Sequence, residues 1–166
     1  MKKLVSMEEN ESIVNEMLKG NEVIEKALEE WKHNRENIGD MASIYKSITD
    51  RDRKYGGLIV SVESGSVPAG ADNVEFFNGD KPVKLNKVRD SDDEKYLLVF
   101  TSRERFREYN DTAGVVMFIR EVFSLLADIE GVNGIVINMG KEEIIINKCV
   151  MKMISQMIKI IDRCET

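Results

Sequence analysis

The chain of 166 residues is long enough for one hydrophobic core of ordinary size and too short for two full domains. Its composition, 42% hydrophobic and 33% charged with 2 prolines, excludes an intrinsically disordered chain. The net charge is -6, and basic residues alternate with acidic ones, so we expect no nucleic-acid partner. No apolar run approaches the ~18 residues that span a bilayer, and the N-terminus does not continue as a signal peptide. We therefore expect a cytoplasmic protein without a membrane partner.

The first third of the chain is expected to be helical. Apolar residues recur at helical spacing over residues 13–18 and again over residues 23–31. Asn21 is a candidate N-cap of the second helix, because its side-chain oxygen can accept a hydrogen bond from an amide of the first turn. Asp40 would cap a short third helix, and residues 49–54 would form a charged link after it.

Strands are expected from residue 57 onward. Residues 57–62 and 95–101 are apolar runs typical of buried strands. Between them, residues 74–77 and 83–88 flank Asn78-Gly79. Both residues of this pair tolerate positive φ, so the segment predicts a β-hairpin.

The second half alternates strands and helices. Residues 101–104 (Thr-Ser-Arg-Glu) fit a capping box that begins a helix directly after the preceding strand. The remaining elements expected are strands at residues 115–117, 135–137 and 144–146, a helix at residues 118–129, and a terminal helix capped by Asn147. This order predicts an α+β or α/β fold, with a mixed β-sheet, an N-terminal helical segment and helices packed against the sheet.

The residues that usually carry catalysis or bind metals are few. His33, the one histidine, has no signature that pairs it with Cys149 or Cys164. The spacing of the cysteines fits neither a zinc site nor a redox motif, and we expect both to behave as small apolar residues. The acidic run at residues 90–94 lacks the glycine and the distal glutamate of an EF-hand and is interpreted as a polar turn. The sequence therefore predicts no catalytic set, no metal site and no cofactor.

Two segments carry a family resemblance. Residues 96–102 (Tyr-Leu-Leu-Val-Phe-Thr-Ser) and residues 131–138 (Gly-Val-Asn-Gly-Ile-Val-Ile-Asn) resemble motifs of the SseB N-terminal domain, a bacterial family. Met139 stands where that family usually has proline. The resemblance covers roughly residues 21–154. It implies a single SseB N-terminal-like domain over residues 1–166, with residues 1–20 as an N-terminal helical extension.

The resemblance implies a fold more than a reaction. The family is named for enhanced serine sensitivity and is sometimes associated with type III secretion, and it brings no established catalytic residues. Its motif positions are interpreted here as fold determinants. Phe100 would fill the core, Thr101 would cap a helix, and Asn138 would satisfy a turn.

The terminal helix suggests a surface for proteins. Met151, Met153 and Met157 have flexible, polarisable side chains that suit adaptable interfaces, and Met151 and Ile160 lie outside the main apolar stripe. Burial of the whole helix against the sheet is the alternative. The first hypothesis is a non-enzymatic protein-interaction or regulatory domain of the SseB type, with an unknown protein partner or self-association as a homodimer.

A second hypothesis is a domain that binds a small ligand, an amino acid or an anion. If the strands ending near residues 101 and 138 are parallel neighbours, their carboxyl ends would form a pocket. The residues expected there are Thr101, Ser102, Arg103, Asn138 and Gly140. A hydrolase that uses Ser102 ranks third, because no base accompanies that serine.

Overall fold

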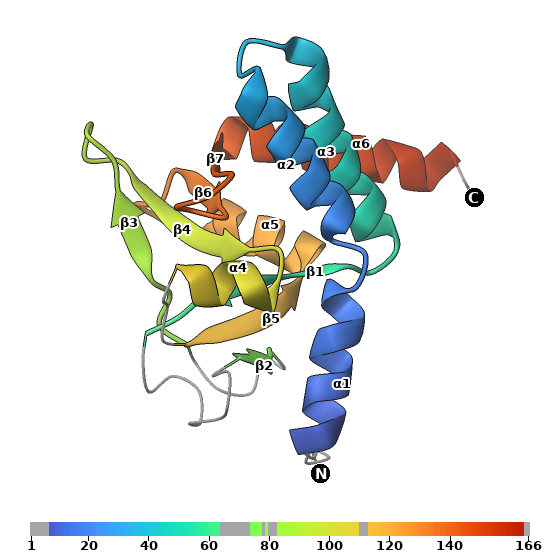
Figure 1. Cartoon of the computed structure of the whole chain (residues 1–166), viewed down its shortest axis with the longest axis vertical. Helices are drawn as coiled ribbons and strands as arrows, with labels where there is room; N and C mark the ends of the chain where they lie inside the picture. The colour runs from blue at the N-terminus through green and yellow to red at the C-terminus, as the bar shows by residue number, and fades with distance from the viewer. Residues whose placement is uncertain (1–6, 64–73, 78, 80–82, 110–112, 165–166) are drawn as a thin grey trace.

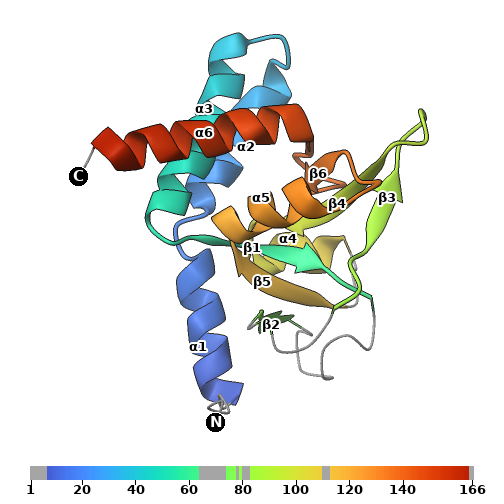
Figure 2. The same cartoon turned by 180° about the vertical axis from the view of Figure 1, so that it is seen from behind.

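The computed structural model describes residues 7–63, 74–77, 79, 83–109 and 113–164. These residues form an α+β fold in which helices cover both faces of one mixed sheet (Figures 1 and 2). The helices are α1 (Met7–Leu18), α2 (Glu22–His33), α3 (Ile38–Arg53), α4 (Arg103–Glu108), α5 (Ile119–Asp128) and α6 (Lys148–Cys164). The strands are β1 (Gly57–Ser61), β2 (Val74–Phe76), β3 (Lys87–Arg89), β4 (Lys95–Phe100), β5 (Gly114–Phe118), β6 (Gly134–Ile137) and β7 (Ile144–Asn147). The predicted fold class is confirmed.

The sheet has the strand order β2-β5-β1-β4-β6-β7, and β3 pairs with β4 beside this path. Two neighbouring pairs, β2 with β5 and β4 with β6, are parallel, and the other pairs are antiparallel. The parallel pairing of β4 with β6 brings the residues that follow Phe100 and Ile137 to the same edge of the sheet. This is the condition that the small-ligand hypothesis requires.

The side chains of each strand contribute alternately to two hydrophobic clusters, because successive residues of a strand point to opposite faces of the sheet. In β4, Leu97 and Val99 belong to the cluster under α2, α3, α5 and α6, whereas Leu98 and Phe100 belong to the cluster under α1 and α4. Phe100 is fully buried and packs edge-on against Phe106 of α4. The expectation that Phe100 fills the core is confirmed.

The third helix is longer than the sequence indicates. Asn37, not Asp40, is its N-cap, and the Asn37 side chain accepts a hydrogen bond from the Asp40 amide. The charged link expected at residues 49–54 is wrong, because α3 continues through most of it. Arg51 and Asp52 are buried there. Arg51 donates a hydrogen bond to Asn21 Oδ1 and Asp52 forms an ion pair with Arg120, so partners from other elements allow a charged segment to remain helical against the core.

The hairpin predicted around Asn78-Gly79 does not form between its expected strands. β2 pairs in parallel with β5, and β3 pairs in antiparallel with β4. Part of the intervening turn, including Asn78, lies outside the described residues. A local turn signal indicates that the chain can reverse, but the choice of strand partner depends on distant segments. Among the helices that the structure describes, none is long and apolar enough to cross a membrane.

Candidate functional site

A polar cluster lies where β4 and β6 end. The Thr101 amide donates to Asn138 Oδ1 at 3.0 Å, and Asn138 Nδ2 donates to Thr101 Oγ1 at 2.9 Å. The Thr101 hydroxyl in turn donates to Glu25 Oε1 of α2 at 2.7 Å. Thr101 and Asn138 are both buried. The cluster therefore fastens two parallel strands to each other and to a helix, while its polar atoms satisfy one another.

Asn138 also shapes the turn after β6. Its φ is 52°, a left-handed conformation that asparagine tolerates better than most residues. The Lys141 amide donates back to its carbonyl at 3.2 Å. Asn138 thus has the role in a turn that the sequence predicted. Its side chain also bridges to Thr101, and this contact was not predicted.

The side chain of Asn21 forms a second group of buried hydrogen bonds next to this cluster. Its Nδ2 donates to the Gly57 carbonyl at 2.8 Å and to the Thr101 carbonyl at 2.9 Å, and Arg51 Nε donates to Asn21 Oδ1 at 3.0 Å. The expectation that Asn21 caps α2 through its side chain is wrong, because that side chain is used to join β1, β4 and α3. Burial lowers the pKa of Arg51, and Glu22 partly opposes the shift.

The capping box expected at residues 101–104 is also displaced. Ser102, not Thr101, is the N-cap of α4, and its hydroxyl accepts a hydrogen bond from the Arg105 amide at 3.2 Å. Thr101 cannot serve as the cap, because it is committed to Glu25 and Asn138. Arg103 Nε donates to Asn15 Oδ1 of α1 at 3.2 Å. Ser102 and Arg103 therefore have structural partners.

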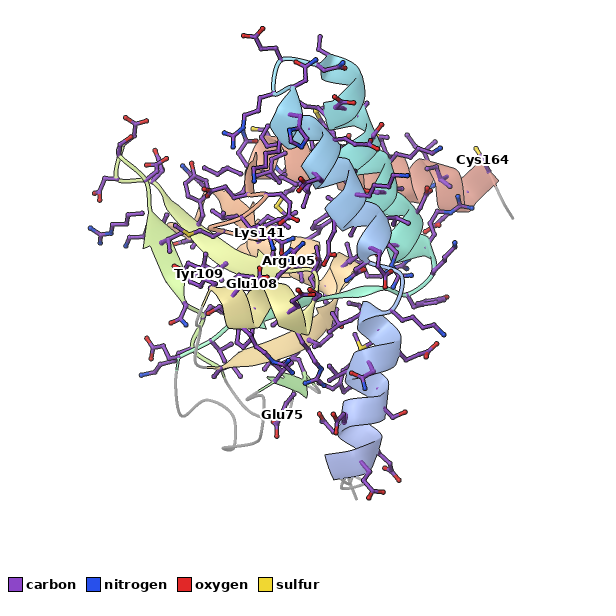
Figure 3. All side chains as sticks on the ribbon, viewed as in Figure 1. Glu75, Arg105, Glu108, Tyr109, Lys141 and Cys164 are labelled. Carbon is purple, nitrogen blue, oxygen red and sulfur yellow. The ribbon has the colours of Figure 1, made fainter. Side chains whose placement is uncertain are left out.

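A small pocket lies beside the polar cluster, with a volume of about 160 Å³. Of the five residues predicted for a ligand site, Asn138 and Gly140 line it, and Thr101, Ser102 and Arg103 do not. The rest of the lining is Arg105, Glu108, Tyr109, Met139 and Lys141. Figure 3 shows the labelled members of this group close together around α4.

The charges of this pocket are already paired. Arg105 Nη2 lies 2.8 Å from Glu142 Oε1, which is buried, and Arg105 Nη1 lies 3.3 Å from Glu108 Oε2. Lys141 Nζ lies 3.2 Å from Glu108 Oε1. Burial by itself lowers the pKa of Arg105, but the hydrogen bond that Arg105 donates to Glu142 and the charges of Glu142, Glu25 and Glu108 outweigh it and raise that pKa.

Two buried atoms of the Arg105–Glu142 pair, Nε and Oε2, have no hydrogen-bond partner. One is a donor and the other an acceptor, and they belong to the same two side chains. A small rotation into the side-by-side geometry of arginine with a carboxylate would let each satisfy the other. These two unpaired atoms therefore do not require a bound ligand.

Neither histidine nor cysteine gathers near these groups as a catalytic set would require. His33 is exposed at the end of α2, with Nε2 at 3.4 Å from Glu29 Oε1. Cys149 and Cys164 are both exposed on α6, so the expectation that they behave as small apolar residues does not describe their surroundings. Within the described residues, no group of three or more His, Cys, Asp or Glu side chains could hold a metal ion.

The terminal helix α6 divides its apolar residues between two faces. Asn147 accepts a hydrogen bond from the Val150 amide at 3.0 Å, as expected of its N-cap. Met151 is only 3% exposed and packs in the core, so its expected place outside the main stripe is wrong. In contrast, Met153, Met157 and Ile160 are 61%, 44% and 59% exposed. These three lie on the outward face of α6 and remain available for an interface there, whereas Met151 lies on the opposite, core-facing side of the helix.

Several residues of the site escaped sequence reasoning. Glu25 and Glu142 lie in charged stretches that resemble solvent-exposed segments, yet Glu25 meets Thr101 and Glu142 is buried against Arg105. The nearest available signal was the crowding of arginines at residues 103–107, since buried arginines commonly pair with carboxylates.

The comparisons with known proteins agree with the two motifs. No curated protein and no solved structure was found to match the chain. The family model of the SseB protein N-terminal domain matches residues 24–146, close to the predicted extent of the resemblance. The match contains the Thr101–Asn138 cluster, and all of α1 and α6 lies outside it. The chain belongs to the SseB family, through its N-terminal domain.

Proposed function

We propose that this chain is a non-enzymatic protein-interaction domain that associates with a second copy through the outward face of α6. One observation supports this proposal above others: three large apolar side chains of α6 are exposed although the same helix has a well-buried core face. A soluble domain that gains nothing from such exposure would carry polar residues there.

The exposed residues follow the spacing of a helix–helix seam. Met153, Met157, Ile160 and Cys164, here called the outer seam, are separated by four, three and four residues. This is the repeat that places side chains along one line of a helix and lets a second helix pack against it. No charged residue lies on the seam itself, so two copies of it can face each other without repulsion.

The expected dimer is weak. Each exposed Met or Ile gains about 1 kcal/mol when its remaining exposed surface is buried, since full burial is worth about 1.5–3 kcal/mol. A contact formed by three such side chains on each copy is typical of weak, transient association, and we expect a dissociation constant on the order of 0.1–1 mM.

Sedimentation equilibrium of the full chain tests the proposal. The double variant M153E/M157E introduces repelling charges into the seam and should remove the concentration-dependent rise in mass. The matched control is V23E/I38E, which places glutamates at apolar residues that are 51% and 82% exposed on other helices. A chain that stays monomeric up to millimolar concentration, and that also recovers nothing from a native lysate, would contradict the proposal.

A domain that binds a small ligand is the second candidate. The pocket beside Asn138 and Gly140, at the carboxyl ends of two parallel strands, favours it. Its paired charges suit a ligand with both an anionic and a cationic group. In a thermal-shift screen of amino acids and anions, a compound that binds this pocket should raise the melting temperature of the wild-type chain and should not raise that of an R105M variant. The absence of any stabilised condition would eliminate this candidate.

A further inference from the structure

A groove between α5 and α6 forms a second surface on the terminal helix. Its volume is about 650 Å³, and its apolar floor includes Phe123, Leu126, Met151 and Ile158, which are between 1% and 6% exposed. In Figure 2 α6 crosses in front of α3, and α5 lies beside it over the sheet. A cavity of about 150 Å³ holds a benzene-sized group, so the groove has room for about four apolar side chains.

The groove and the outer seam lie on opposite sides of α6. The residues of α6 that line the groove include Met151, Ser155, Ile158 and Asp162, which recur at helical spacing on one face. None of the four outer-seam residues lines the groove. At 100° per residue, the two sets point in nearly opposite directions from the helix axis. The two surfaces can therefore be occupied at the same time.

The charge of the groove is opposite to that of the chain. Its described lining carries four basic residues against one acidic residue, Asp162: Arg120, Lys148, Lys152 and Lys159. The chain as a whole has a net charge of -6. A local excess of positive charge on a protein with a negative net charge favours partners with a complementary negative surface.

Two of the four basic residues already have partners within the chain. Arg120 Nη2 lies 3.1 Å from Oδ2 of buried Asp52, and this hydrogen bond makes the largest contribution to the raised pKa of Arg120, to which the charge of Asp162 also adds. Lys148 donates to the Ile129 carbonyl. Lys152 and Lys159 are exposed and lie two helical turns apart, about 10 Å along the axis.

A second copy does not fit this groove. In a two-fold symmetric contact each surface faces itself, so the lysines of one copy would approach the lysines of the other. An acidic helix with one apolar face meets both features of the groove, because its apolar residues enter the hollow and its carboxylates reach the lysines. We propose that the α5–α6 groove binds an acidic amphipathic helix of a partner protein, with carboxylates two turns apart opposite Lys152 and Lys159.

A defined helical library tests the proposal with the full chain as bait. Displayed 18-residue peptides carry leucine at i, i+3, i+4 and i+7 of an alanine-rich helix, and their flanking positions vary among Glu, Lys and Gln. We expect glutamate to be enriched at flanking positions two turns apart. Binding of a selected peptide, measured by fluorescence anisotropy, should weaken by about tenfold or more in K152E/K159E. The same selection on K152E/K159E should enrich lysine instead.

Two matched variants separate the groove from the rest of the surface. K26E/K32E makes the same change of net charge at exposed lysines of α2 and should leave binding unchanged. M153E/M157E, which should abolish self-association, should also leave peptide binding unchanged, so the failure of one proposal is distinguishable from the failure of the other. No enrichment over input, equal enrichment of Glu and Lys, or equal loss in K26E/K32E and K152E/K159E would overturn the proposal. A dimer that K152E/K159E disrupts would also overturn it, because a second copy would then occupy the groove.

Discussion

Asn138→Ala is expected to destabilise the chain strongly, because one side chain both bridges two parallel strands and occupies a left-handed backbone position. The variant leaves the buried Thr101 amide without its acceptor at 3.0 Å, which costs about 1–3 kcal/mol. Alanine at a φ of 52° adds about 1–2 kcal/mol. The free energy of unfolding should therefore fall by about 2–5 kcal/mol, out of the roughly 5–15 kcal/mol usual for a domain.

Urea unfolding followed by circular dichroism measures this change, and a second variant separates its two causes. Asn138→Gly loses the same hydrogen bonds but adopts positive φ without strain, so it should be less destabilised than Asn138→Ala. Thr101→Val removes the hydroxyl partner, and the double variant T101V/N138A should lose less than the sum of the single variants. A loss below about 1 kcal/mol for Asn138→Ala, or strict additivity in this cycle, would show that the Thr101–Asn138 bridge does not stabilise the fold as proposed.

Three further changes test other parts of the structure. Ser102→Ala should lower the unfolding free energy by about 1 kcal/mol through loss of the α4 N-cap, and no change would show that Ser102 does not cap. Gly134→Ala should prevent folding or cost more than about 4 kcal/mol, because an added Cβ would collide with the Ile146 carbonyl of β7; a well-folded variant by circular dichroism would contradict this packing. The hydrogen bond that the Glu94 amide donates to the Asp90 carboxylate makes the largest contribution to lowering the pKa of Asp90. The ionised Asp90 carboxylate therefore stabilises the fold above the ordinary pKa of aspartate, and this stabilisation is lost as the pH falls through the lowered pKa. The difference in urea midpoint between wild type and Asp90→Asn should therefore shrink below about pH 4, and a constant difference would refute the assignment.

The strands of the core could be predicted from sequence with fair accuracy, because long apolar runs are nearly sufficient to define buried strands. The apolar runs at residues 57–62 and 95–101 became β1 and β4 with small changes at their ends. Their parallel or antiparallel pairing could not be predicted. The Asn78-Gly79 signal led to a hairpin that the structure replaces with pairing to distant strands.

The roles of individual polar residues were harder to predict. Asn21 and Thr101 are residue types that cap helices; Asn21 lies directly before α2, and Thr101 lies two residues before the start of α4. The structure uses them instead as buried bridges, because their helices are packed so closely against the ends of β1 and β4 that nearby carbonyls and amides need partners. Sequence spacing alone does not contain that proximity.

The terminal helix shows the same limit for apolar residues. Its sequence has apolar side chains on two faces, so helical periodicity could not decide which face is buried. The structure buries Met151, Ile154 and Ile158 and exposes Met153 and Met157. The exposed face is therefore known only from the packing of α6 over α3 and α5.

A dilution series followed by NMR tests most directly whether the outer seam of α6 is an interaction surface. Amide chemical shifts are recorded for the full chain from about 0.05 mM to about 2 mM, which spans the expected dissociation constant. We predict that the concentration-dependent shifts cluster on residues 153–164 and vanish in M153E/M157E. Shifts that are absent over this range, or that cluster on another surface such as α2, would contradict the claim.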